Sequence, residues 1–121
     1  MTLLGIGNDI IEINRIEKAI SRENFIKKVF TEEEIKYIIS RGNRTETYAG
    51  KFSAKEAISK ALGTGIRNFS LTDIEILNND LGKPYVKFKN NIANFNEKYF
   101  INISISHCKE YATAVAIIFV K

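Results

Sequence analysis

The chain has 121 residues, of which 45% are hydrophobic and 26% are charged, with one cysteine and a formal net charge of +4. These proportions predict one globular domain over residues 1–121, and they exclude a disordered chain, a collagen-like fibre and a disulfide-stapled miniprotein. The mild basic excess favours acidic partners without choosing between nucleic acid, nucleotide phosphates and an acidic protein.

The first predicted element is a strand over residues 3–13. Gly5, Gly7 and Asp9 share one face of it, because successive strand residues alternate between two faces. The two glycines leave room for another segment to approach closely. A carboxylate in an apolar strand is costly unless it is paired or bound to a cation. Asp9 is therefore either a cation ligand or an aspartate that caps a loop or pairs with a lysine.

Two helices are predicted next. Asn14 can cap the first, which is short, with Glu17 at the third helical position as its capping-box partner. The second covers Glu32–Ser40, because Thr31 and Glu34 have the capping-box spacing and a glycine follows the last turn.

A longer helix is predicted over residues 45–62, with Gly63 as its left-handed C-terminal cap. One face of this helix carries only small residues, which allows it to lie close to a sheet or to another backbone. These residues are Gly50, Ser53, Ala54, Ala57 and Ala61.

On the same helix, Glu56 precedes Lys60 by four residues, so the two side chains share a face. One interpretation is a solvated ion pair that contributes little to stability. The other is that Glu56 offers an oxygen to Mg²⁺ while Lys60 neutralises phosphate. If the helix packs on the first strand, Glu56 can meet Asp9.

The C-terminal half predicts strands. Ile74 and Ile76, and then residues 85–88, form two strands around a turn region of sequence NNDLG. Residues 101–107 alternate isoleucine with polar residues, and Tyr111–Val120 completes a hairpin with them. The predicted class is α+β, with a mainly antiparallel sheet packed on the long helix.

His107, the only histidine, ends the alternating strand on its isoleucine side. It is either a structural histidine or a ligand contact. One histidine beside Cys108 argues against zinc, and neighbouring strand residues point to opposite faces, which argues against a Cys–His nucleophilic pair. The Gly63–Gly65 segment lacks the order of a Walker loop and predicts a helix cap with a turn.

The N-terminal residues lack the basic region and the long apolar stretch of a signal peptide, and no apolar run approaches the ~18 residues of a transmembrane helix. We therefore expect a cytoplasmic protein without a membrane partner. Cys108 is the only cysteine, so the chain has no internal disulfide.

Taken in order, five motifs resemble those of the holo-[acyl-carrier-protein] synthase family, the small bacterial 4'-phosphopantetheinyl transferases. Each motif is weak alone, but the five follow one another over nearly the whole chain. They are GIGNDIIEINRI at residues 5–16, FTEEE at 30–34, FSAKEAISKALGTGI at 52–66, GKP at 82–84 and ISISH at 103–107.

The resemblance implies a 4'-phosphopantetheinyl transferase-like fold and a phosphoryl transfer that depends on Mg²⁺ or Mn²⁺. In this reaction, which belongs to fatty acid biosynthesis, a serine of apo acyl carrier protein attacks the β-phosphate of coenzyme A, and adenosine 3',5'-bisphosphate leaves. Asp9 and Glu56 match the family's metal-binding carboxylates and, with Lys60 near the pyrophosphate, are the implied catalytic residues. The residues that match or adjoin its coenzyme A contacts are Arg44, Lys51, Lys60, Gly63, Gly65 and His107.

The resemblance also implies a homotrimer with active sites at the subunit interfaces. Basic residues of the first helix region dock the acidic helix of the carrier protein. Arg15 matches this role and Arg22 is a further candidate, whereas Lys27 and Lys28 are either docking residues or part of a solvated helix face.

Three residues depart from the family pattern: Asn8, Lys51 and Cys108. Asn8 replaces an apolar residue, and Cys108 stands where a hydroxyl or carboxyl side chain is commoner. Lys51 stands where arginine is frequent, so the charge is kept but the bidentate geometry is lost.

Two other classes of protein fit this sequence less well than the enzyme. A small basic nucleic-acid-binding module predicts clustered basic residues with exposed aromatic rings, whereas this sequence spreads its charge and places its aromatic residues in apolar segments. We therefore expect no nucleic-acid partner. A non-enzymatic assembly domain leaves Asp9 and Glu56 without a purpose.

Overall fold

The structure, a computed structural model, describes residues 1–63 and 69–121. Its elements follow one another as β1 (Thr2–Glu12), α1 (Ile13–Ile20), α2 (Glu23–Val29), α3 (Glu32–Ser40), α4 (Thr45–Ala61), η1 (Leu71–Asp73), β2 (Ile74–Asn78), β3 (Pro84–Phe88), η2 (Asn90–Ile92), α5 (Phe95–Lys98), β4 (Tyr99–His107) and β5 (Tyr111–Val120). Within the described ranges, no helix is both long and apolar enough to span a membrane.

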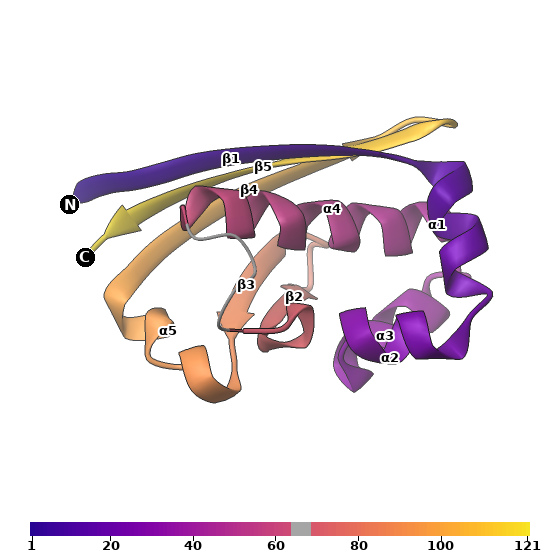
Figure 1. Cartoon of the computed structure of the whole chain (residues 1–121), viewed down its shortest axis with the longest axis horizontal. Coiled ribbons are helices and arrows are strands. Elements are labelled where there is room, and N and C mark those ends of the chain that lie inside the picture. Colours follow the sequence, from indigo (N-terminus) through magenta and orange to yellow (C-terminus); the bar gives the residue numbers. More distant parts are fainter. Residues whose placement is uncertain (64–68) are drawn as a thin grey trace.

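Two antiparallel sheets flank the long helix. One has three strands in the order β1-β5-β4, and the other pairs β2 with β3. Figure 1 shows α4 lying along one face of the three-stranded sheet, with β2, β3 and the shorter helices α2 and α3 on its other side. The predicted α+β class with a mainly antiparallel sheet is confirmed.

Small residues on both surfaces bring α4 close to β1. A Cβ atom at Gly5 would overlap the carbonyl oxygen of Ala61, and one at Gly7 would overlap that of Ala57. The β5 residues that face α4 include alanines, so the helix also lies low over the centre of the sheet. The prediction that the small-residue face of the helix permits close packing is therefore confirmed.

A buried ion pair fastens α3 and β2 to α4. Lys55 Nζ lies 2.7 Å from a Glu34 carboxylate oxygen, and both side chains are fully buried. Glu34 also accepts hydrogen bonds from the backbone amides of Thr31 (2.8 Å) and Ile76 (2.7 Å). Because each charge satisfies the other, the loss of either partner alone would leave a buried charge, at a cost of about 3–5 kcal/mol.

The capping box of Thr31 and Glu34 and the helix Glu32–Ser40 are confirmed, as is the positive φ of Gly63 (+79°). The long helix ends at Ala61, close to its predicted end. The predicted Asn14 cap is wrong: α1 begins two residues earlier, at Ile13, because β1 runs directly into it and Glu12 takes the N-cap position without a side-chain bond.

Candidate active site

Asp9 is held at the contact between β1 and α4. The Ser53 hydroxyl donates to its carboxylate at 3.1 Å, and Lys60 Nζ approaches the other carboxylate oxygen at 3.4 Å. Lys60 Nζ also donates to the carbonyl of Asn8 at 3.0 Å, which places the ammonium group beside the strand. The Asp9 side chain is 15% exposed, so its carboxylate is mostly buried but still reaches solvent.

Glu56 lies on the same side of α4, one turn before Lys60, and is half-buried. Burial raises the pKa of its carboxyl, the negative charge of Asp9 raises the pKa further, and the positive charge of Lys60 opposes both. The structure thus brings together the three residues, Asp9, Glu56 and Lys60, that the sequence predicted to act jointly.

Two neighbouring carboxylates in this arrangement suit a divalent cation. Over residues 1–63 and 69–121, there is no group of three or more acidic, histidine or cysteine side chains that could enclose a metal by itself. Mg²⁺ is usually bound by one or two carboxylates together with substrate phosphates and water. Asp9 and Glu56 fit that pattern, since the mutual repulsion that raises the Glu56 pKa is relieved by a cation.

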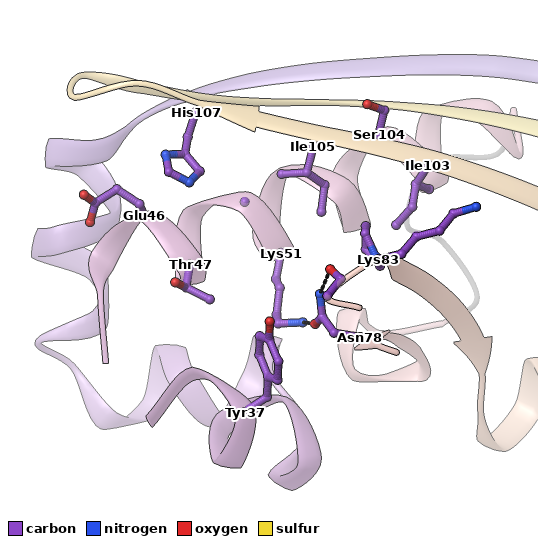
Figure 2. A pocket seen from close by; sticks show the side chains of 13 residues that line it. Tyr37, Glu46, Thr47, Lys51, Asn78, Lys83, Ile103, Ser104, Ile105 and His107 are labelled. Carbon is purple, nitrogen blue, oxygen red and sulfur yellow. Dashed lines mark hydrogen bonds between the residues drawn. The ribbon is translucent and has the colours of Figure 1, made fainter. Parts of the chain in front are cut away.

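A pocket of about 460 Å³ opens at the other edge of the sheet, between α4, β4 and the turn that joins β2 to β3. Figure 2 shows His107 and Glu46 at one end of this pocket and Lys83 at the other. Its walls combine an apolar side with a polar one. The lining residues are Tyr37, Glu46, Thr47, Gly50, Lys51, Asn78, Gly82, Lys83, Pro84, Ile103, Ser104, Ile105 and His107.

Lys51 is a buried cation in the wall of this pocket. Its side chain donates to the Ile76 carbonyl (2.7 Å) and to the side-chain oxygen of Asn78 (2.8 Å), and its ammonium group lies 4.8 Å from the centre of the Tyr37 ring. Burial lowers the pKa of Lys51 to about 8. Within the described part of the chain, no carboxylate lies within 4 Å of it, so its charge suits an anionic ligand in the pocket.

His107 and Arg44 border the same region. His107, exposed at the end of β4, lines the pocket on the isoleucine side of the strand, as predicted. Arg44 precedes α4 and pairs with Glu46 at 3.1 Å. A backbone hydrogen bond, the hydrogen bond from Arg44 and the charges of Arg44 and His107 lower the pKa of Glu46. Arg44 also lines an adjacent hollow with Arg41.

The predicted site residues form two groups that do not meet within one chain: the carboxylates with Lys60, and the residues in and around the pocket. Asp9 is on β1 and His107 is on β4, at opposite edges of the three-stranded sheet. Lys51 and Glu56 point about 140° apart around α4, because a helix turns about 100° per residue. Asp9, Glu56 and Lys60 are absent from the described lining of the pocket.

The remaining predicted residues lie elsewhere. Arg15 is exposed on α1, and Arg22, exposed between α1 and α2, lines a shallow hollow that includes Lys28. Lys27 pairs with Glu23 at 3.2 Å, in keeping with a solvated helix face. Gly63 follows α4 and is exposed; Gly65 lies outside the described residues.

Several pocket residues were missed at the level of sequence. Thr47 lies one helical turn before Lys51, so their spacing of four could have indicated a shared face. Tyr37 and Asn78 carry no comparable signal, because α3 and β2 reach the pocket only through the tertiary fold.

Comparisons with known proteins agree on one family. The sequence model of the 4'-phosphopantetheinyl transferase superfamily matches residues 5–116. Holo-[acyl-carrier-protein] synthase from Fusobacterium nucleatum is 66% identical over 120 residues, which cover 96% of this chain and 98% of that protein.

Two crystal structures are similar along essentially their full length. Holo-(acyl-carrier-protein) synthase from Bacillus anthracis, in complex with CoA (3',5'-ADP), is 40% identical, with a TM-score of 0.82 and complete coverage of both chains. Holo-[acyl-carrier-protein] synthase from Neisseria meningitidis is 28% identical, with a TM-score of 0.88 and coverage of 98% of this chain and 99% of that one.

Proposed function

The chain belongs to the 4'-phosphopantetheinyl transferase superfamily, and we propose that it catalyses its transfer with a divalent cation bound by Asp9 and Glu56. Its activity is that of a holo-[acyl-carrier-protein] synthase: it moves the 4'-phosphopantetheine group of coenzyme A to a serine of apo acyl carrier protein. The family match favours the enzyme over the nucleic-acid-binding module and the assembly domain.

The convergence of Asp9, Glu56 and Lys60 is the observation that carries the proposed mechanism. The serine hydroxyl oxygen forms a bond to the β-phosphorus and releases its proton to solvent, the bond from that phosphorus to the bridging oxygen breaks, and the electron pair leaves with adenosine 3',5'-bisphosphate. A Mg²⁺ or Mn²⁺ held by Asp9 and Glu56 would supply positive charge to the pyrophosphate. Lys60 neutralises negative charge on the phosphates, and Ser53 keeps the Asp9 carboxylate oriented.

The pocket lined by His107 is proposed to bind the nucleotide part of coenzyme A. The positive charge in and beside its wall, from Lys51 and the nearby Arg44, suits an anionic ligand, the exposed ring of His107 offers a hydrogen bond to phosphate, and the apolar wall of Ile103 and Ile105 suits a base. The B. anthracis structure with CoA (3',5'-ADP) supports a nucleotide ligand for this fold. Gly63, which follows α4, stays a proposed contact with coenzyme A, and so does Gly65, which lies outside the described residues.

Two observations support a homotrimer with shared sites. The carboxylates and the pocket lie at opposite edges of the sheet, so a nucleotide held by one subunit can meet the carboxylates of the next. The face of the sheet away from α4 is apolar and open: Ile6 and Ile10 are each 65% exposed and Phe100 is 42% exposed. Apolar faces of this kind are usually covered by a partner, here a second copy of the chain.

Arg15 and Arg22 are proposed to dock the carrier protein. Both side chains are exposed, Arg15 on the first turn of α1 and Arg22 between α1 and α2, where positive charge can attract an acidic helix without contacting the reacting phosphate.

A direct assay tests the proposed function. Purified protein is incubated with apo acyl carrier protein, coenzyme A and Mg²⁺, and the carrier mass is measured. We expect the carrier to gain one 4'-phosphopantetheine group, and EDTA to abolish the gain until excess Mg²⁺ is restored. An unmodified carrier would reject the function, whereas transfer that is indifferent to EDTA would reject only the divalent cation.

A further inference from the structure

Lys51 is connected to the rim of the nucleotide pocket by a two-step relay. Its ammonium group donates to the side-chain oxygen of Asn78 at 2.8 Å, and the Asn78 side-chain nitrogen donates to the carbonyl of Gly82 at 3.1 Å. Figure 2 shows this relay leading from α4 to the wall of the pocket. Gly82 and Lys83 belong to that wall. The hydrogen bonds of Lys51 therefore connect the rim of the pocket to α4, the helix that also carries Glu56.

The turn that Lys51 reaches is itself closed by hydrogen bonds. The amide of Gly82 donates to the carbonyl of Asn79 at 2.9 Å, and the amide of Lys83 donates to the Asn79 side chain at 2.9 Å. A turn closed in this way moves as one piece, and its position relative to α4 then depends on Asn78. Gly82 has φ +86°, which restricts the conformations open to any substitute there.

Most of the hydrogen-bond donors of the Lys51 ammonium group are already used within the protein. A lysine ammonium has three N–H groups. Two of them bond to Ile76 and Asn78, and the ammonium group also lies against the Tyr37 ring. With the side chain 3% exposed, its geometry is set by the protein and leaves little freedom to follow a ligand. An arginine has five donors in a fork and could serve both the turn and a phosphate.

We propose that Lys51 is a positioning residue, which sets the rim of the nucleotide pocket through Asn78 and Gly82 instead of donating a hydrogen bond to the ligand. This inference rests on the proposed binding of coenzyme A in the pocket and deepens it. Asn78 is then a positioning residue as well. Arg44 and His107 keep the role of direct phosphate contacts, which Lys51 does not share.

The test compares Lys51→Met, Asn78→Ala and the double variant, with Lys36→Met as a control that removes an exposed lysine from α3. Each variant is assayed with coenzyme A and with 3'-dephospho-coenzyme A. We expect each single variant to raise the KM for coenzyme A about tenfold, as the loss of a buried hydrogen bond predicts. The double variant should be no worse than the singles, because both substitutions break one relay.

Further readouts separate positioning from a general loss of structure. The kcat and the KM for the carrier protein should stay near wild type, and Lys51→Arg should restore the KM for coenzyme A. The preference for coenzyme A over its 3'-dephospho form should change by less than about twofold, since no phosphate contact is removed. Hydrogen exchange at residues 79–83 should accelerate in both single variants without ligand.

The proposal is overturned if Asn78→Ala behaves as wild type, if the two substitutions add, or if Lys51→Met abolishes the preference for the 3'-phosphate. That last result would make Lys51 a direct phosphate contact and leave the proposed function intact. If the wild-type protein itself neither binds nor uses coenzyme A, the proposed function has failed, whatever the exchange data show.

Discussion

The Ser53 hydroxyl donates to both the carboxylate and the backbone carbonyl of Asp9, at 3.1 and 3.2 Å. One residue of α4 therefore fixes the side chain and the backbone of one residue of β1. The contact exists because the helix lies against two glycines of the strand. The geometry proposed for catalysis is thus tied to a close contact between the helix and the strand.

Gly7→Ala should disrupt both the packing and the site. The added Cβ would overlap the Ala57 carbonyl oxygen and lie 2.7 Å from the Ala61 amide nitrogen, both of which are backbone atoms of α4 that cannot turn aside. We expect a loss of about 1–3 kcal/mol in the free energy of unfolding, measured in urea, and weaker Mn²⁺ binding. Asn8→Ala, whose side chain is exposed on the other face of the strand, is the matched control. Equal stability of the two variants would contradict the close contact.

Asp9→Asn and Glu56→Gln should each remove cation binding while the protein stays folded. The amides keep the size of the side chains but lose the negative charge, so we expect Mn²⁺ affinity and turnover to fall roughly a hundredfold or more. Calorimetric titration with Mn²⁺ and the carrier-mass assay measure the two effects. Glu17→Gln, an exposed glutamate of α1, controls for the change in net charge. Wild-type turnover with unchanged metal dependence in either variant would end this assignment.

Part of the candidate site could be predicted from the sequence, and part could not. Asp9 and Glu56 were accessible from the sequence, because a charge beside two glycines and a small-residue helix face predict a close contact. The burial of Lys51 and Lys55 was not, since a lysine's exposure depends on acceptors such as Ile76 and Leu71 that come from other elements. For the same reason the helix α2 was missed: its seven residues gain their order from packing around Phe25 and Phe30.

Protein stability should depend on pH through Lys51. Its pKa is about 8 in the folded protein, against 10.5 for an ordinary lysine. Between these pH values the unfolded chain binds one more proton at this position, so the free energy of unfolding rises with pH. The rise amounts to at most about 3 kcal/mol, at 1.36 kcal/mol per pKa unit.

Urea unfolding between pH 7.5 and 10.5 measures this dependence, with Lys51→Met as the reference. Lys55, whose charge also lowers the pKa of Lys51, is present in both proteins, and so the difference between them reports mainly on Lys51. A difference that stays flat with pH would show that Lys51 titrates as an exposed lysine, and a difference of the opposite sign would show that folding raises the pKa of Lys51; either result contradicts the prediction.

Shared active sites predict that two inactive variants complement each other. One variant, Asp9→Asn, keeps the nucleotide pocket, and the other, Arg44→Ala with His107→Ala, keeps the carboxylates. After mixing, unfolding and refolding, about a quarter of the interfaces in random trimers combine two intact halves. We expect a corresponding share of wild-type activity, and sedimentation equilibrium should give the mass of a trimer. A fully active monomer, or no recovery in verified mixed trimers, would contradict shared sites.

The docking surface can be separated from the chemistry by reversing one charge. Arg15 is exposed on α1 and is not among the residues that line the nucleotide pocket, so Arg15→Glu should weaken attraction to an acidic helix and raise the KM for the carrier protein. Rim charges act mainly on association, and salt screens them. The dependence of that KM on ionic strength should therefore flatten. The KM for coenzyme A should barely change, and kcat at saturating carrier should fall only modestly.

Lys98→Glu on α5, at the other end of the molecule in Figure 1, controls for net charge. If Arg15→Glu weakened coenzyme A binding and left the carrier KM unchanged, this division of the surface would be wrong, because the charge at Arg15 would then belong to the nucleotide site.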